Sequence, residues 1–203
     1  MKSEITSMIR ESKETIYTVG HSNIPISQFI DLLRTFRIAV VVDVRSRPFS
    51  KYASQFNRDL INQTLSANNL IYVYMGDLLG GKPEDRKYYD RGGHVMYDHI
   101  AESASFQTGI SRLMKGIALY RVALMCSEED PTNCHRKLLI GKVLREQGIH
   151  VLHIRKGGII QTEEDLNTTK ARLQPGLFGS HVDPPWRSAE PVLTKGVTNK
   201  IMI

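Results

Sequence analysis

Apolar residues occur along the chain in short continuous runs that alternate with stretches of helical periodicity. The runs, typical of strands covered on both faces, occupy residues 15–19, 38–44, 70–74, 121–125 and 149–154. Helical spacing predicts a helix with Phe29 and Leu33 on its buried face, and further helices at 57–68, 106–117 and from 133 or 134 to 147. Strands that alternate with helices predict an α/β fold: a three-layer, mostly parallel sheet of about five strands with helices on both faces.

The same pattern predicts the domain organisation. Residues 1–14 precede the first strand and form an N-terminal extension, and residues 15–174 form a single α/β domain. Thr162 can cap a short helix that ends near Leu173. Prolines and glycines then disfavour regular structure, so residues 175–203 are predicted to be an irregular tail. A chain of 203 residues with 41% hydrophobic content is long enough to bury one sizeable core.

Composition narrows the function classes. The formal charge of +6 comes from 27 basic and 21 acidic residues without a dense basic tract, so an anionic small molecule or nucleic acid is permitted as a partner but not indicated. Two cysteines, no apolar leader and no run of membrane-spanning length predict a cytoplasmic protein with no membrane association. The dinucleotide and phosphate-loop glycine motifs are both missing, so no cofactor is predicted. The oligomeric state stays open.

Polar residues gather where the predicted strands end. In open parallel sheets the loops at the carboxyl ends of the strands form the ligand crevice. The residues that follow the first four strands are His21 and Ser22, then Asp43, Arg45 and Arg47, then Asp77, Gly80 and Gly81, and finally the segment 126–136. If the strands are parallel, these segments meet at one edge of the sheet. This convergence predicts an enzyme or a ligand-binding protein.

Each of these residues also has a purely structural interpretation. Asp43 and Arg45 share a face of their strand and could form a structural ion pair. His21 could cap a turn, and Tyr97 could pack locally rather than stack on a substrate. Cys126 ends a buried strand, where a free cysteine commonly behaves as a small hydrophobe.

The segment 126–136 has the sequence CSEEDPTNCHR and carries the most chemistry. Two thiols, an imidazole, a guanidinium and three carboxylates are too costly to bury without partners, so their clustering suggests a site. Cys134 is predicted in the first turn of a helix capped by Thr132 or Asn133, where the backbone N–H groups and the neighbouring basic residues favour a thiolate. The three carboxylates of the segment disfavour a thiolate. Which thiol is more acidic therefore stays open.

Four segments of the chain carry a resemblance to a known family: VGHS at 19–22, VDVRSRP at 42–48, LGG at 79–81 and the segment 126–136. Together they resemble the domain-of-unknown-function 488 family over about residues 15–156. The resemblance implies a cytoplasmic bacterial or archaeal α/β protein with an enzymatic role, and it names no reaction. A weaker similarity to rhodanese-like and cysteine-phosphatase domains lies in the order Asp-x-Arg, then cysteine. The longer, acidic loop before Arg136 argues against direct transfer of the phosphatase mechanism.

The favoured hypothesis is a thiol-dependent transferase or hydrolase that acts on a phosphate-bearing substrate, such as a nucleotide or a nucleic-acid derivative. The predicted catalytic residues are Cys126, Cys134, His135, His21, Asp43 and Glu128. The predicted substrate-binding residues are Arg45, Arg47, Arg136, Gly80, Gly81, Ser22 and Tyr97.

Three alternatives stay open. Zinc held by Cys126, Cys134 and His135, with His21 as a further candidate ligand, would give a hydrolase or a structural site. The spacing matches no common zinc motif and adjacent helical residues point about 100° apart, so no metal site is predicted. A non-catalytic nucleic-acid binder or adaptor would use the basic loop 82–91 and the tail with Trp186 and Arg187. Acid–base hydrolysis would instead use Glu128, Glu129 or Asp43, with the thiols only shaping the pocket.

Overall fold

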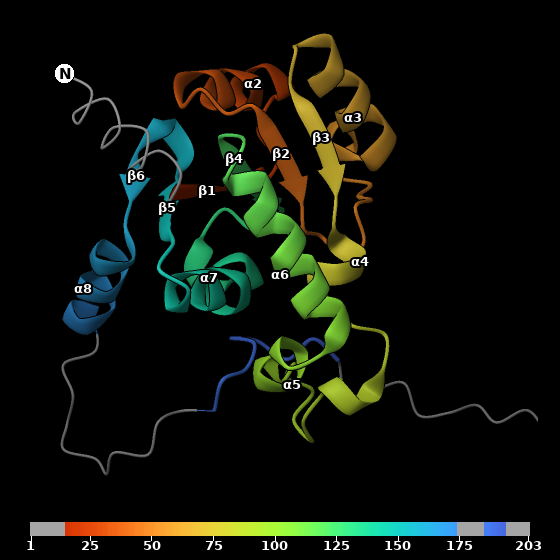
Figure 1. The fold of residues 1–203 in the computed structure, drawn as a ribbon, viewed down its shortest axis with the longest axis vertical. Coiled ribbons are helices and arrows are strands. Elements are labelled where there is room, and N and C mark those ends of the chain that lie inside the picture. Colours follow the sequence, from red (N-terminus) through yellow and green to blue (C-terminus); the bar gives the residue numbers. More distant parts are fainter. Residues whose placement is uncertain (1–14, 174–184, 194–203) are drawn as a thin grey trace, which may run out of the picture.

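A computed structural model describes residues 15–173 and 185–193 of the chain. The described part forms one six-stranded sheet between two layers of helices, which confirms the predicted fold class (Figure 1). The strand order is β3-β2-β4-β1-β5-β6, and every neighbouring pair is parallel except β5 and β6. The strands are β1 (Thr15–Gly20), β2 (Val40–Asp43), β3 (Ile71–Tyr74), β4 (Val122–Cys126), β5 (His150–Ile154) and β6 (Ile160–Gln161).

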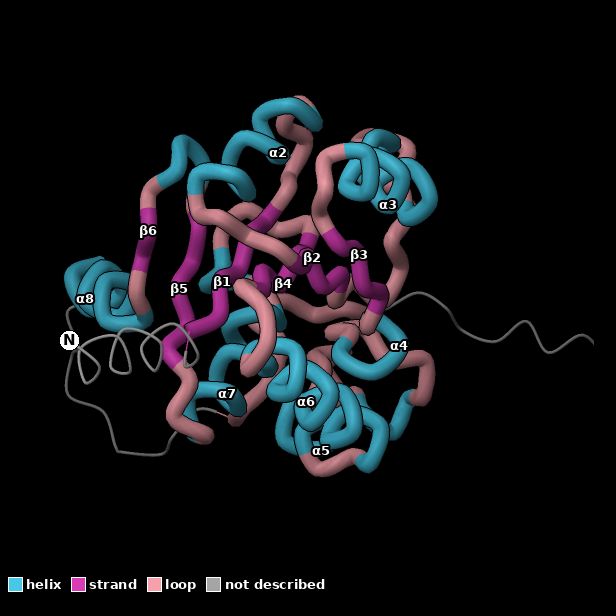
Figure 2. Tube along the Cα trace, turned by 45° about the horizontal axis from the view of Figure 1, so that its top comes forward, coloured by secondary structure: helices cyan, strands magenta, loops and turns pink. Residues whose placement is uncertain are grey.

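The helices lie on both faces of this sheet (Figure 2). One face carries α2 (Ile26–Thr35) and α3 (Arg58–Ala67), and the other carries α4 (Gly76–Leu79), α5 (Tyr97–Ala101), α6 (Ala104–Ile117) and α7 (Lys142–Glu146). Helix α8 (Glu163–Leu173) follows β6 at the sheet edge. A π-helical segment, Arg136–Gly141, leads into α7, and short 3₁₀ turns occupy Ser54–Phe56, Arg86–Tyr88, Pro131–Asn133 and Lys156–Gly158.

Alternation along the strands divides the apolar residues between two cores. The core beneath α6 and α7 contains Val40, Val42 and Cys126, whereas the core beneath α2 and α3 contains Val41 and Met125. Successive side chains of a strand point to opposite faces, so each strand contributes to both cores. This explains why the strands appear in the sequence as continuous apolar runs rather than as alternating ones.

Three local predictions are corrected by the structure. Strand β6 was not predicted because two residues carry no detectable periodicity. No helix was predicted between the third strand and residue 93, but this region contains α4 and a 3₁₀ turn, both too short for helical spacing to be visible. The helix predicted from residue 133 or 134 begins only at Arg136, because Asp130 rather than Thr132 or Asn133 accepts the capping bond and Pro131–Asn133 forms a 3₁₀ turn.

The C-terminal segment 185–193 packs against the helical layer around α5. Ser188 N–H donates to the Val95 carbonyl at 2.9 Å, and Tyr97 N–H donates to the Trp186 carbonyl at 2.9 Å. The Trp186 indole donates to the Leu138 carbonyl, and the Lys142 ammonium lies 3.8 Å from the centre of its ring. The Trp186 side chain therefore contacts other groups of the protein through both its N–H and its ring. Among the described helices, none combines the length and apolarity that a membrane span requires.

Candidate functional site

The carboxyl ends of the central strands meet at one edge of the sheet. Gly20 pairs with Cys126 in the register of β1 and β4, and Asp43 pairs with Met125 in that of β2 and β4. Because Cys126 is one residue beyond Met125, strand alternation directs the side chains of Asp43 and Cys126 to opposite faces. The predicted site residues therefore share an edge but form two separate groups.

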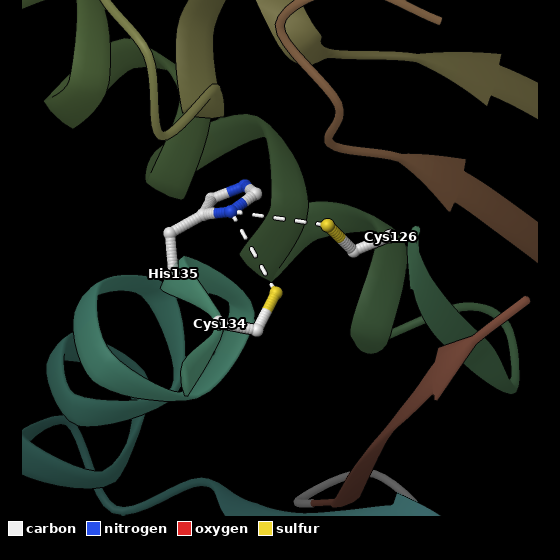
Figure 3. A group of neighbouring side chains, drawn as sticks. All are labelled: Cys126, Cys134 and His135. Atoms are coloured by element: carbon white, nitrogen blue, oxygen red, sulfur yellow. Dashed lines mark hydrogen bonds between the residues drawn. The ribbon is translucent and has the colours of Figure 1, made fainter. Parts of the chain in front are cut away.

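The first group consists of Cys126, Cys134 and His135, which we call the thiol cluster (Figure 3). The imidazole Nδ1 lies 3.9 Å from the Cys126 sulfur and 3.8 Å from the Cys134 sulfur. Both thiols are free and nearly buried, with 6% and 2% of their surface exposed. The three donor atoms lie within 4.8 Å of one another, close enough to hold one metal ion after small movements.

The orientation of the His135 ring follows from its other nitrogen. Nε2 lies 2.9 Å from the Val44 carbonyl oxygen, which can only accept, so Nε2 carries the proton. In the neutral ring Nδ1 is then an unprotonated acceptor facing both thiols. Gly81 packs against the opposite side of the ring, where an added Cβ would lie 2.4 Å from the imidazole Cγ. The ring is thus held by a hydrogen bond and by a close backbone contact.

Arg136 fixes the loop that joins the two cysteines. Its guanidinium is fully buried and donates to the backbone carbonyls of Glu128 and Glu129, while Nε donates to the Thr18 hydroxyl at 3.2 Å. Gly20 allows the loop to lie directly on β1, because an added Cβ would lie 1.7 Å from the Glu128 carbonyl oxygen. The donors of Arg136 are therefore directed at the protein itself rather than at a cavity.

The two thiols differ in acidity. The hydrogen bond with Cys134 and burial raise the pKa of Cys126 far above its ordinary value. Burial also raises the pKa of Cys134, but the hydrogen bond from Cys126, the charge of Arg136 and the backbone N–H of Arg136 outweigh it and lower that pKa to about 7. Cys134 is thus the more acidic thiol.

The second group consists of His21, Asp43 and Arg45 on the opposite face, beneath α2 and α3. Arg45 binds the Asp43 carboxylate with two nitrogens, at 2.6 and 2.9 Å, and both side chains are buried. Arg45 also donates to the Phe56 carbonyl and to Nε2 of His21, whose ring stacks on Phe56. Tyr72 donates to the same carboxylate at 2.7 Å. Asp43 and Arg45 therefore form a buried ion pair, as their positions on one face of the strand indicated.

Acid is expected to destabilise the fold through His21 and His153. Burial and then the charge of Arg45 lower the pKa of His21 from 6.5 to about 4, and burial lowers the pKa of His153. Below about pH 6.5 the histidines of the unfolded chain bind protons that the folded chain excludes. Their contribution to the free energy of unfolding is therefore fully present above this pH and is lost as the pH falls towards 4. Urea unfolding should show that His21 alone lowers the free energy of unfolding by about 2 kcal/mol between pH 7 and pH 5. His21→Gln should flatten this dependence, and an unchanged slope would contradict the assignment.

The acidic residues of the motif do not join the thiol cluster. Glu129 binds Arg155 with both oxygens, at 2.7 and 2.9 Å, and this pairing lowers its pKa to about 2. Asp130 caps the turn at Thr132, and Glu128 is exposed. A carboxylate with so low a pKa is a poor general acid, so these contacts give no support to the acid–base hypothesis.

A cavity of about 400 Å³ opens beside the thiol cluster. Its lining includes Ser46, Arg47, Asp77, Gly80, Lys82, Glu84 and Tyr88. Gly80 and Lys82 line the cavity while Gly81, between them, touches the His135 ring, so one turn of this loop separates the cavity from the cluster. Within the described residues, the side chains of Arg47 and Lys82 have no ion-pair partner.

Sequence reasoning named Arg47, Asp77 and Gly80 at this sheet edge and placed Lys82 in a basic loop, but it missed the serines Ser103 and Ser105 at the start of α6. Lys82 directly follows the glycine pair, which was the available signal. Ser22 lies exposed at the sheet edge with a φ of 46°, and Tyr97 is buried in the core beneath α6.

Comparison with known proteins adds one family-level finding. Residues 25–143 match the model of a family described as Domain of unknown function DUF488. The match spans more than half of the chain and includes the thiol cluster, Arg45 and the glycine pair, whereas His21 lies before it. The chain matches no curated protein and no solved structure.

Proposed function

The chain belongs to the DUF488 family, whose description names no reaction, and we propose from its own site that it is a thiol-dependent transferase or hydrolase. The observation that carries the proposal is the Cys134–His135 pair. The sulfur lies 3.8 Å from an imidazole nitrogen that is kept free to accept a proton, and the Val44 carbonyl orients the ring from its other side. A nucleophile, a base and a group that orients the base are the three parts of an activated nucleophile.

In this proposal Cys134 is the nucleophile and its proton passes to Nδ1 of His135. The neighbouring Cys126 thiol helps to lower the pKa of Cys134 and so favours its thiolate. The separation of 3.8 Å is long for direct proton transfer, but catalytic hydrogen bonds commonly tighten only when substrate is bound.

The cavity supports an anionic, phosphate-bearing substrate. The unpaired cations Arg47 and Lys82 suit a phosphate group, whereas Asp77 and Glu84 suit hydroxyl or amino groups. The ring of Tyr88 offers a stacking surface. A nucleotide carries all three features, and the cavity volume of about 400 Å³ lies within the usual range for small-molecule sites. Arg45 and Arg136 already donate to protein groups, so the proposal assigns phosphate binding to Arg47 and Lys82.

Selective alkylation tests the nucleophile. In the reduced protein, freed of metal by a chelator, iodoacetamide at pH 7 should modify Cys134 at least about tenfold faster than Cys126, because its thiolate is the better populated. Peptide mass spectrometry measures both rates. His135→Ala should slow the reaction of Cys134, whereas His99→Ala, at an exposed position, should not. Equal rates at the two thiols would refute the assignment of Cys134.

Calorimetric titration with adenosine monophosphate and with inorganic phosphate tests the substrate class. The double variant Arg47→Ala/Lys82→Ala should weaken nucleotide binding by at least about tenfold through loss of two charged contacts. Lys115→Ala, an exposed lysine of α6, is the matched control. Absence of nucleotide binding would contradict this substrate class. Salt-dependent binding of single-stranded RNA that survives loss of Cys134 and His135 would instead favour a non-catalytic nucleic-acid binder.

A further inference from the structure

The thiol cluster has the donor set and the dimensions of a metal site. Two sulfurs and one imidazole nitrogen are soft ligands of the kind that zinc prefers. Around a tetrahedral zinc ion, with Zn–S of about 2.3 Å and Zn–N of about 2.0 Å, sulfur and nitrogen ligands lie about 3.6 Å apart. The observed sulfur–nitrogen separations of 3.8 and 3.9 Å need to shrink by only a few tenths of an ångström, and all three donor atoms lie within 4.8 Å of one another.

The local backbone removes the main geometric objection to such a site. Adjacent residues of a helix point about 100° apart, but Cys134 is not helical. Its φ and ψ of −114° and 138° are extended, whereas His135, at −58° and −23°, already has helical dihedrals. This change of conformation between neighbours lets both side chains face the same point, as Figure 3 shows.

The surroundings of His135 are those of a metal ligand. Histidines that bind a metal through one nitrogen almost always donate their other N–H to a carboxylate, a carbonyl or water. Here Nε2–H donates to the Val44 carbonyl, and Gly81 lies so close to the ring that an added Cβ would be 2.4 Å from Cγ. Nδ1 is thus directed at the point between the two thiols before any ion arrives.

Charge is also balanced. A divalent ion with two thiolates is a neutral unit, which suits a site where both cysteines are nearly buried. Glu129 is held by Arg155 and Asp130 by Thr132, so neither carboxylate is directed at the sulfurs. In the part of the chain that the structure describes, the group holds three donors, so the fourth tetrahedral position would have no ligand from these residues.

We propose that Cys126, Cys134 and His135 bind one zinc ion and that the bound ion silences the thiol. Each S–H bond is replaced by a Zn–S bond, both protons leave to solvent, and no electron is transferred. The silencing rests on the proposed function, because zinc would occupy the nucleophile and its base together. The binding itself does not depend on that function.

Metal titration of the reduced full-length chain tests the binding. After chelation, dialysis against zinc should restore one ion per chain by mass spectrometry of the metal, and cobalt should give a thiolate charge-transfer band. Cys126→Ser, Cys134→Ser and His135→Ala should each weaken cobalt binding at least tenfold. Gly81→Ala keeps all three donors but displaces the ring and should also weaken it, whereas Gly116→Ala, whose added Cβ meets nothing within 4 Å, should not. Substoichiometric zinc, or cobalt binding that persists in His135→Ala, would overturn the site.

Alkylation with and without zinc tests the silencing separately. Stoichiometric zinc should slow the reaction of Cys134 with iodoacetamide at least tenfold, and a chelator should restore the rate. If zinc binds but leaves this rate unchanged, the silencing is wrong while the metal site stands. If the metal-free protein shows no preference for Cys134, the proposed nucleophile fails while the metal titration still decides the site.

Discussion

Replacing Asp43 by alanine is expected to lower the free energy of unfolding by about 3–5 kcal/mol, because it leaves a buried guanidinium without its counter-charge. Asp43 is fully buried and Arg45 is 5% exposed, and two nitrogens of Arg45 bind the carboxylate. Water cannot replace the lost carboxylate at such a position without opening the core beneath α2 and α3. Urea unfolding of the two proteins at pH 7 measures the difference.

The hydroxyl of Tyr72 provides the matched control for this prediction. It donates to the same carboxylate at 2.7 Å but carries no charge. Tyr72→Phe should therefore cost only about 1 kcal/mol. A loss below about 1 kcal/mol in Asp43→Ala would show that the ion pair is dispensable for stability. Asp43 would then be better explained by the catalytic role predicted from the sequence.

Arg136→Met is expected to cost about 3 kcal/mol or more, because it leaves two backbone carbonyls of the loop unpaired and removes one of the two partners of the buried Thr18 hydroxyl, the other being His153. Arg136 is completely buried and donates to the carbonyls of Glu128 and Glu129 and to Thr18. Its loss should also loosen the loop between the cysteines, so that iodoacetamide modifies both thiols at similar rates rather than Cys134 preferentially. Urea unfolding and peptide mass spectrometry measure the two effects.

Arg155 is the control for the arginine substitution. It has the same side chain and pairs with Glu129 of the same loop, but the pair is partly exposed. Arg155→Met should cost less than about 1 kcal/mol and leave the alkylation pattern unchanged. If Arg136→Met is no more harmful than Arg155→Met, the loop does not depend on the buried guanidinium.

The sequence predicted the fold because the central strands are covered on both faces and therefore appear as uninterrupted apolar runs. It predicted the start of the helix after Cys134 wrongly, because Asp130 and Pro131 start a separate 3₁₀ turn first. Residue propensities do not show whether this segment starts the helix or forms a separate 3₁₀ turn. The error mattered, since the extended backbone of Cys134 decides whether its sulfur can meet the His135 ring.

The convergence at one sheet edge was predictable, but its division into two groups was not. Alternation shows which residues of one strand share a face, yet the relation between two strands depends on their register. In the structure Asp43 is paired with Met125 rather than with Cys126, and this single step places the carboxylate and the thiol on opposite faces. The partners of Arg136 are backbone carbonyls of a loop, which no residue pattern reveals.

Val44 lies between Asp43 and Arg45, and its carbonyl is the group that orients His135. The Arg45 N–H of the same peptide unit donates to the Asp43 carboxylate at 3.1 Å, so one peptide unit is bonded to the ion pair and to the imidazole. The position of the Asp43 carboxylate beneath α2 and α3 is thus coupled to the His135 ring on the other face through the planar Val44–Arg45 amide. Loosening the Asp43–Arg45 ion pair would therefore let the imidazole tilt away from both sulfurs, although the three residues of the thiol cluster are unchanged.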